Sequence, residues 1–199
     1  MSLQSKSDSL ENSLAGLLKI RTVVQRSVNA EVMIDGISRG ILPSGLLLLL
    51  GFSQEGDALP AGTAEWFESA TAHQRAELLQ PLFQKWWDKL AQLRIFPDEQ
   101  GRMNLSLLQQ PQQCGVYLVS QFTLFADLRK GNRPGFSAAL SAPVAKQCFA
   151  QMVEFVTAQA AGRPVLSGVF AADMKVTLTN DGPVTLLFDC SMNKGIVAL

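Results

Sequence analysis

The sequence predicts an α+β domain, built from a mainly antiparallel, barrel-like β-sheet with two or three helices packed on it. Three observations support this prediction. Several apolar stretches have the length of a strand, and their residues are either continuous or alternate with polar ones. Residue combinations that favour tight turns separate these stretches. Other regions repeat their apolar residues at the spacing of an amphipathic helix.

The first strands are expected before Gly51. Apolar and polar residues alternate up to Asp35-Gly36, which is a strong hairpin signal. The segment from Leu46 to Leu50 is a continuous apolar run bounded by glycine, and its length favours a fully buried strand over a helix. These features predict a hairpin whose second strand enters the core.

Two later regions also predict strands. Cys114 to Phe125 is apolar for most of its length. Further along, apolar and polar residues alternate toward the segment Asn180-Asp181-Gly182-Pro183. This composition predicts that the chain turns there and returns as a strand over Val184 to Phe188.

Helices are expected in an insert around residues 55–92 and again after residue 140. Trp66 and Phe67 indicate a first helix, and Pro81 is expected to break it or to start it again. The aromatic stripe that follows is interpreted as packing on the sheet. In the last helix, Ser141 is expected to be the capping residue, ahead of a stripe that begins at Val144.

Length and composition predict one domain. The chain has 199 residues, 47% of them hydrophobic, and no linker-like stretch interrupts its middle. We assign residues 19–190 to the domain, residues 1–18 to a disordered N-terminal tail and residues 191–199 to a C-terminal tail. The polar start does not fit a secretory signal, and no apolar run has membrane-spanning length, so a cytoplasmic protein without membrane contact is expected. Three widely spaced cysteines favour free thiols.

The charge balance limits the expected partners. There are 17 Lys+Arg and 17 Asp+Glu residues, whereas strong nucleic-acid binders usually carry a basic excess. A nucleic-acid role therefore requires a small contact or a local basic cluster. Arg129, Lys130 and Arg133 form one such cluster in a predicted loop.

The sequence lacks the residues that several classes of enzyme need for catalysis. The single histidine, His73, lies in the predicted helical insert and is interpreted as a surface or packing residue rather than a catalytic base. The sequence offers no zinc-ligand pattern and no glycine-rich phosphate loop. Neither a metal nor a cofactor is expected. Hydrolysis of an activated ester suits the remaining groups, because it requires chiefly a positioned water and backbone donors for the oxyanion.

Two segments give the decisive resemblance. Ser120-Gln121-Phe122-Thr123-Leu124 resembles the SQFTL signature of D-aminoacyl-tRNA deacylases, and Asn180 to Thr185 resembles that family's NxGPxT signature. Further matches follow in the family's order: residues 21–26, 93–96, 101–106, 129–134 and 172–174. The similarity extends from about Ile20 to Asp189. The sequence departs from the family in the long segment between residues 51 and 93, at Gly135 and Ala171, and in its N-terminal tail.

The resemblance implies a homodimer with its active site at the subunit interface. Gly182-Pro183 would form a cis peptide bond and enter the partner's pocket beside Asn180, where its carbonyl groups would exclude an L side chain. Ser120, Gln121, Phe122 and Thr123 would line the aminoacyl pocket, with the amides of Phe122 and Thr123 holding the carbonyl oxygen. Met174 and Phe136 would bound the terminal adenosine, and the cluster Arg129, Lys130 and Arg133 would contact tRNA.

The predicted activity is hydrolysis of the ester bond of D-aminoacyl-tRNA and, because glycine lacks a side chain, of glycyl-tRNA. Two alternatives remain. One is an L-specific editing domain of the same fold. The other is a DNA- or RNA-binding protein that retains this fold; a steep dependence of DNA affinity on salt would favour it.

Overall fold

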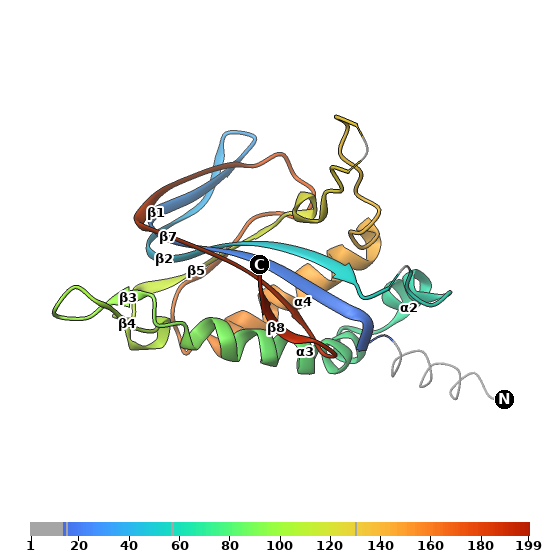
Figure 1. Cartoon of the computed structure of the whole chain (residues 1–199), viewed down its shortest axis with the longest axis horizontal. Coiled ribbons are helices and arrows are strands. Elements are labelled where there is room, and N and C mark those ends of the chain that lie inside the picture. Colours follow the sequence, from blue (N-terminus) through green and yellow to red (C-terminus); the bar gives the residue numbers. More distant parts are fainter. Residues whose placement is uncertain (1–13, 15, 57, 130) are drawn as a thin grey trace.

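A computed structural model describes residues 14, 16–56, 58–129 and 131–199. Most of the predicted N-terminal tail lies outside these ranges. Its last part belongs to the domain, since Leu14 and Leu18 are both buried in the main core. Figure 1 shows the sheet with its helices gathered on one side and the β1–β2 hairpin curving away from them.

The sheet has six strands in the order β6-β5-β2-β1-β7-β8. Their bounds are β1 Leu18–Ile34, β2 Ile37–Gln54, β5 Cys114–Ser120, β6 Val165–Ser167, β7 Lys175–Ser191 and β8 Gly195–Ala198. A separate small pair joins β3 Phe96–Pro97 to β4 Met103–Leu105. The predicted hairpin at Asp35-Gly36 is confirmed, because β1 and β2 pair antiparallel around it.

The predicted barrel-like, mainly antiparallel sheet is only partly correct. β2 pairs with β5 in parallel, and β5 pairs with β6 in parallel, so the sheet is mixed. It also stays open among the described residues, with β6 and β8 at its two edges. The reason is topological: a long crossover containing helices connects β2 to β5, and such a crossover brings the second strand back in the same direction.

Three α-helices lie wholly within the described residues, α2 Thr63–Ser69, α3 Ala72–Gln92 and α4 Ala142–Gln159, together with two 3-10 turns, η1 Leu107–Gln109 and η2 Phe122–Phe125. The prediction that Pro81 breaks the helix is wrong, because α3 continues through it. Buried residues on both sides of Pro81, among them Leu79 and Leu82, enter one core, and this packing outweighs one lost backbone hydrogen bond. Ser141 occupies the N-cap of α4, but its side chain makes no capping hydrogen bond.

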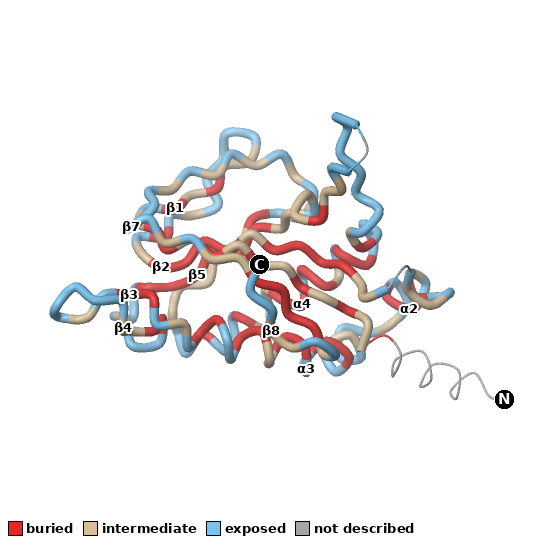
Figure 2. Tube along the Cα trace, in the orientation of Figure 1, coloured by how far each residue is buried: buried red, intermediate tan, exposed pale blue. Residues whose placement is uncertain are grey.

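Two apolar clusters lie on opposite faces of the sheet. The larger one fills the space between the sheet and the helices, and Figure 2 shows this buried layer facing α3 and α4. The smaller one, on the face away from the helices, includes Leu47, Tyr117 and Val119. Half-buried residues surround the smaller cluster: Leu49, Met174, Val176 and Leu178. We call these two surfaces the covered face and the open face.

The predicted turn at residues 180–183 is also wrong. β7 passes through this segment as one strand. Its register with β1 changes from Ser27↔Asn180 to Gln25↔Thr185, so residues 181–184 bulge outward opposite the single residue Arg26. The predicted C-terminal tail contains β8, which pairs with the end of β7. No helix in the described ranges is long and apolar enough to cross a membrane.

Candidate active site

The junction of β5 with η2 positions the first signature. Gln121 leaves the strand, and its backbone amide donates to the Leu50 carbonyl at 2.7 Å. The chain then tightens into η2, where the Ala126 amide donates to the Thr123 carbonyl at 3.1 Å. The Gln121 side-chain amide donates to the Thr123 hydroxyl. This junction fixes the side chains of Gln121 and Thr123 against each other.

Five of the predicted site residues meet in one pocket of about 390 Å³, which we call the main pocket. They are Ser120, Gln121, Phe122, Phe136 and Met174. The rings of Phe122 and Phe136 pack edge to face with their centroids 5.0 Å apart. The other lining residues are apolar: Leu50, Phe52, Ala139, Leu140, Ala142, Ala145, Phe170, Ala171 and Ala172. The pocket therefore combines an apolar wall with a few polar groups, as small-molecule sites commonly do.

The backbone at the edge of the main pocket offers hydrogen-bond donors. Phe122 and Thr123 are the first two residues of η2, where amides have no partner inside the turn. Within the described part of the chain, neither amide donates to another backbone carbonyl. Thr123 does not line the pocket itself, and its hydroxyl accepts the Gln121 hydrogen bond. Two adjacent free amides can stabilise negative charge on a reacting carbonyl oxygen.

The second signature lies outside the main pocket of its own chain. Gly182 and Pro183 are exposed on the bulge of β7, and the peptide bond between them is cis, as predicted. Neither these residues nor Asn180 line the pocket. Arg26, which sequence reasoning quoted within a motif but gave no role, holds the bulge: its Nε lies 3.0 Å from the Asp181 carbonyl oxygen and 2.9 Å from the Asp181 carboxylate.

Position 182 accepts only glycine without rearrangement. Its φ is +122°, which L side chains rarely adopt. A Cβ there would lie 2.9 Å from an Arg26 guanidinium nitrogen and 3.0 Å from the Val184 side chain. Arg26 and Val184 therefore lie close to Gly182 on two sides of the bulge.

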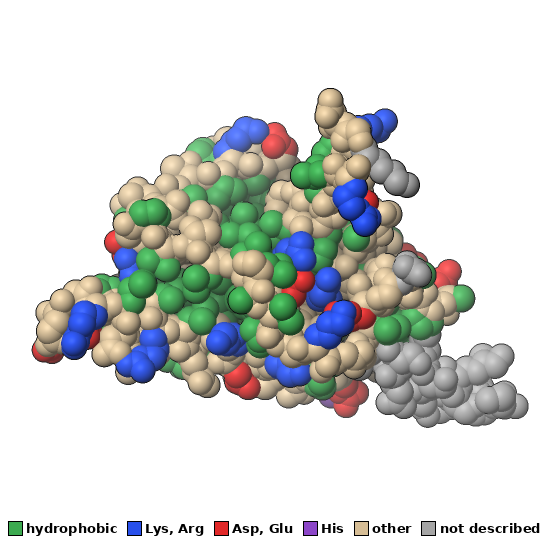
Figure 3. Space-filling model, in the orientation of Figure 1, with side chains coloured by type: hydrophobic (Ala, Val, Ile, Leu, Met, Phe, Trp, Pro, Cys, Tyr) green, Lys and Arg blue, Asp and Glu red, His purple; other side chains and the backbone are tan. Residues whose placement is uncertain are grey.

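A shallow hollow on the open face joins the two signatures. Gln121 and Met174 line both the main pocket and this sheet hollow. At the other end Gln25, which belongs to the same motif as Arg26 and was likewise given no role from the sequence, lines the hollow and donates to Asn180 at 3.4 Å. Figure 3 shows hydrophobic side chains gathered in the hollowed region between the β1–β2 hairpin and the loop after η2. The motif indicates that Gln25 matters, but only the pairing of β1 with β7 shows that it lies beside Asn180.

The basic loop stands at the exposed edge of the main pocket. Reciprocal backbone hydrogen bonds of 2.7 and 2.9 Å between Asp127 and Gly135 close it. Arg129 is exposed and forms two hydrogen bonds of 2.8 Å with the Asp127 carboxylate, which raise the pKa of Arg129. Arg133 is exposed, whereas Lys130 lies outside the described residues. A Cβ at Gly135 would meet its first neighbours at 3.9 Å, so a small side chain would fit there.

The remaining reactive side chains lie away from the main pocket. His73 is exposed on α3 beside Glu77, with 3.4 Å between Nε2 and the carboxylate. Burial raises the pKa of Cys148 to about 12 and that of Cys190 to about 11, so both thiols stay protonated at neutral pH. No group of metal-ligating side chains occurs within the described ranges.

Comparison with known proteins decides the family. A family profile described as D-Tyr-tRNA(Tyr) deacylase matches residues 72–189, more than half of the chain. The D-aminoacyl-tRNA deacylase of Solidesulfovibrio magneticus is 44% identical over 171 residues, covering 85% of this chain and 95% of that protein. The chain belongs to the D-aminoacyl-tRNA deacylase family. It is therefore a hydrolase that acts on aminoacyl-tRNA.

One further relative carries the same family name, and two solved structures share the fold. The D-aminoacyl-tRNA deacylase of Opitutus terrae is 41% identical over 170 residues, covering 85% of this chain and 97% of that protein. A solved structure titled "c-Myc DNA Unwinding Element Binding Protein" is 28% identical with a TM-score of 0.65, covering 84% of this chain and 96% of that chain. A probable eukaryotic D-amino acid tRNA deacylase shares the fold, at 17% identity and a TM-score of 0.60, covering 86% and 99% of the two chains.

Proposed function

We propose that this deacylase is a cytoplasmic homodimer that hydrolyses D-aminoacyl-tRNA and glycyl-tRNA with backbone donors and a substrate hydroxyl, without a metal or cofactor. The observation that carries the proposal is the composition of the main pocket. None of its lining residues has a titratable side chain, yet two free amides lie at its edge. Chemistry in such a pocket depends on positioning and on stabilising the oxyanion.

In the proposed mechanism, the amides of Phe122 and Thr123 hold the ester carbonyl oxygen as negative charge develops on it. The 2′-hydroxyl of the terminal adenosine, which both donates and accepts hydrogen bonds, orients the attacking water. Gln121 supports this water from the pocket wall, beside Ser120. The adenosine ring packs against Phe136 and Met174, two of the apolar lining groups. The basic loop contacts the tRNA backbone through Arg129, Lys130 and Arg133.

The proposed dimer supplies the missing wall for stereochemical selection. The partner's Gly182-Pro183 bulge, with Asn180 beside it, would enter the main pocket and place rigid backbone carbonyls against the substrate's α-carbon. Two observations support this arrangement: Gly182 and Pro183 are exposed on β7, and they do not line the main pocket of their own chain. The half-buried apolar residues of the open face provide a surface for the partner. Glycine passes such a wall because it has no side chain.

The first experiment measures ester loss from D-tyrosyl-, L-tyrosyl- and glycyl-tRNA. We expect rapid loss of the D and glycyl esters and protection of the L ester. Equal hydrolysis of the D and L esters would contradict the chiral wall, and loss of the L ester alone would favour an L-specific editing domain.

A second experiment tests the substrate hydroxyl. A D-aminoacyl ester at the 3′ position of a tRNA ending in 2′-deoxyadenosine should resist the enzyme, because the group that orients the water is missing. The matched tRNA ending in adenosine is the control. Equal rates on the two substrates would show that a group of the protein, and not the substrate hydroxyl, activates the water.

A third experiment tests the shared site. Phe122→Asp changes an exposed pocket residue, and Gly182→Ala introduces a Cβ where Arg26 and Val184 leave no space. Each variant alone should be inactive. In a mixture, half of the dimers combine one intact pocket with one intact bulge, so about a quarter of wild-type activity should return. No recovery in mixtures that sedimentation shows to exchange subunits would place the whole site within one chain.

DNA binding is the second candidate, favoured by the relative whose title names a DNA unwinding element. The equal numbers of basic and acidic residues weaken it. Affinity for duplex DNA measured across a salt series distinguishes the two. A steep decline from a tight complex would support DNA binding, whereas weak binding at all salt concentrations would reject it.

A further inference from the structure

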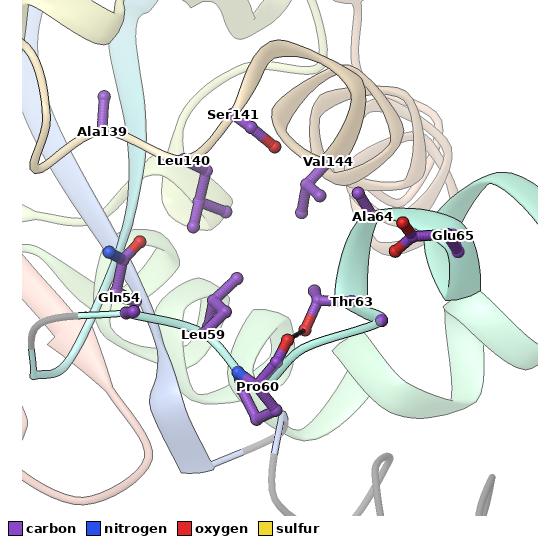
Figure 4. Close-up of a pocket in the computed structure, with 12 residues that line it drawn as sticks. Gln54, Leu59, Pro60, Thr63, Ala64, Glu65, Ala139, Leu140, Ser141 and Val144 are labelled. Carbon is purple, nitrogen blue, oxygen red and sulfur yellow. Dashed lines mark hydrogen bonds between the residues drawn. The ribbon is translucent and has the colours of Figure 1, made fainter.

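The segment between β2 and α3 builds a second cavity that the proposed mechanism does not use. Figure 4 shows this insert hollow, of about 330 Å³, between the first part of α2 and the start of α4. Its lining comes from both sides: Gln54, Ala58, Leu59, Pro60, Gly62, Thr63, Ala64 and Glu65, then Ala139, Leu140, Ser141 and Val144. The match to the family profile begins at Ala72, so α2 lies outside the matched range.

The insert hollow adjoins the main pocket. Ala139 and Leu140 line both cavities. The Leu140 amide donates to the Phe52 carbonyl at 2.9 Å, which fixes this shared wall to β2. The first turn of α4 divides its residues between the two, since Ser141 and Val144 face the hollow while neighbouring alanines face the main pocket. The two cavities are therefore neighbours, as the binding of two adjacent nucleotides of one strand requires.

The hollow has the chemistry of a base-binding site. Its floor is apolar, with the side chains of Leu59, Leu140 and Val144 directed into it in Figure 4. Its rim carries the amide of Gln54 and the carboxylate of Glu65, and the structure gives neither side chain a partner among the described residues. Splayed single-stranded bases are typically bound by packing on one face and by hydrogen bonds to the edge.

Hydrogen bonds hold the loop that lines the hollow and the segment that leads into it. The Thr63 hydroxyl donates to the Pro60 carbonyl at 2.6 Å, so this group is occupied and shapes the loop. Where the segment leaves β2, the Glu55 amide donates to the Leu17 carbonyl at 2.6 Å and the Glu55 carboxylate lies 2.5 Å from the Lys194 ammonium. A pre-formed cavity costs little ordering on binding.

We propose that the insert hollow binds the cytosine of the nucleotide that precedes the terminal adenosine of tRNA. This inference rests on the proposed function, because it requires the adenosine in the main pocket. Every tRNA presents the same cytosine there, and its exocyclic amine is a donor that a carboxylate such as Glu65 accepts. Uracil has an acceptor in that position, which Glu65 would repel. The insert thereby extends recognition to a second nucleotide.

The test uses three small substrates, the 3′ D-tyrosyl esters of adenosine, of CpA and of UpA. We expect KM for the CpA ester to be about tenfold below those for the other two, with similar kcat. Glu65→Gln should remove the preference for CpA over UpA and leave hydrolysis of the adenosine ester unchanged. Glu68→Gln is the matched control, because Glu68 is exposed on the same helix but does not line the hollow.

The possible results distinguish failure of the cytosine site from failure of the proposed function. Equal KM values for the adenosine and CpA esters, or equal behaviour of Glu65→Gln and Glu68→Gln, would overturn the cytosine site and leave the proposed function standing. If no D-tyrosyl ester, including full-length D-tyrosyl-tRNA, is hydrolysed, the proposed function fails and the cytosine site fails with it.

Discussion

The two faces of the sheet use similar residues in different ways. Along β2, Leu46, Leu48 and Leu50 enter the large core beneath α3 and α4, whereas Leu47 and Leu49 point to the open face. On the covered face most apolar residues of the core are buried. On the open face several remain half-buried around the sheet hollow. The main pocket lies where the two faces meet, because Leu50 and Phe52 belong to the large core and Met174 to the open face. The comparison indicates that stability resides mainly on the covered face, while the open face keeps apolar surface on which the proposed partner can pack.

The largest expected effect lies on the covered face, at Trp86. This residue is 0% exposed, and its indole donates to the Thr22 hydroxyl at 2.7 Å. Trp86→Ala should lower the free energy of unfolding by about 3–5 kcal/mol, because it opens a cavity and leaves a buried hydroxyl without its donor. Denaturant unfolding measures the loss. Trp86→Phe is the control, and it should retain most of the stability; equal losses in the two variants would contradict a cavity effect.

Two adjacent leucines on β2 test the difference between the covered face and the open face. Leu48→Ala should cost about 2–5 kcal/mol of unfolding free energy, since Leu48 is 0% exposed in the large core. Leu49→Ala should cost about 1 kcal/mol, because Leu49 is only half-buried. Leu49→Ala should instead weaken self-association in sedimentation experiments. Equal unfolding losses and unchanged association would remove the distinction between the faces.

A smaller effect is expected at Thr123, beside the main pocket. Thr123→Ala removes the acceptor of the Gln121 hydrogen bond but leaves both backbone amides in place. We expect a loss of about 0.5–1.5 kcal/mol in transition-state stabilisation, roughly tenfold at most in kcat/KM on D-tyrosyl-tRNA. Complete inactivation, or an acyl-Thr123 intermediate trapped by rapid quenching, would make Thr123 a nucleophile instead.

The smallest effect should come from the only histidine. His73 is exposed on α3 and touches neither the main pocket nor the sheet hollow. His73→Ala should therefore leave both the deacylation rate and the free energy of unfolding nearly unchanged. A large loss of rate without a loss of stability would make His73 the catalytic base. It would also contradict the proposed role of the substrate hydroxyl.

Local sequence determined much of this protein. The Asp35-Gly36 hairpin, the start of the strand at Cys114 and the helical stripes followed from periodicity and turn chemistry, which act over a few residues. That strand ends at Ser120, before the predicted Phe125, because the chain turns into η2 there. The two signature segments were sufficient to indicate the family, which the comparisons confirm.

Only the tertiary structure decided the rest. The parallel pairing of β5, the continuity of α3 through Pro81 and the bulge in place of a turn at Gly182-Pro183 all depend on distant partners. The same holds for the site: Phe136 and Met174 join Ser120 in one pocket, whereas Gly182 stays outside it. The physical reason is that period and turn propensity are properties of neighbouring residues. What covers a face or fills a pocket is set by burial against residues far away in the chain, whose packing can outweigh a local signal such as proline.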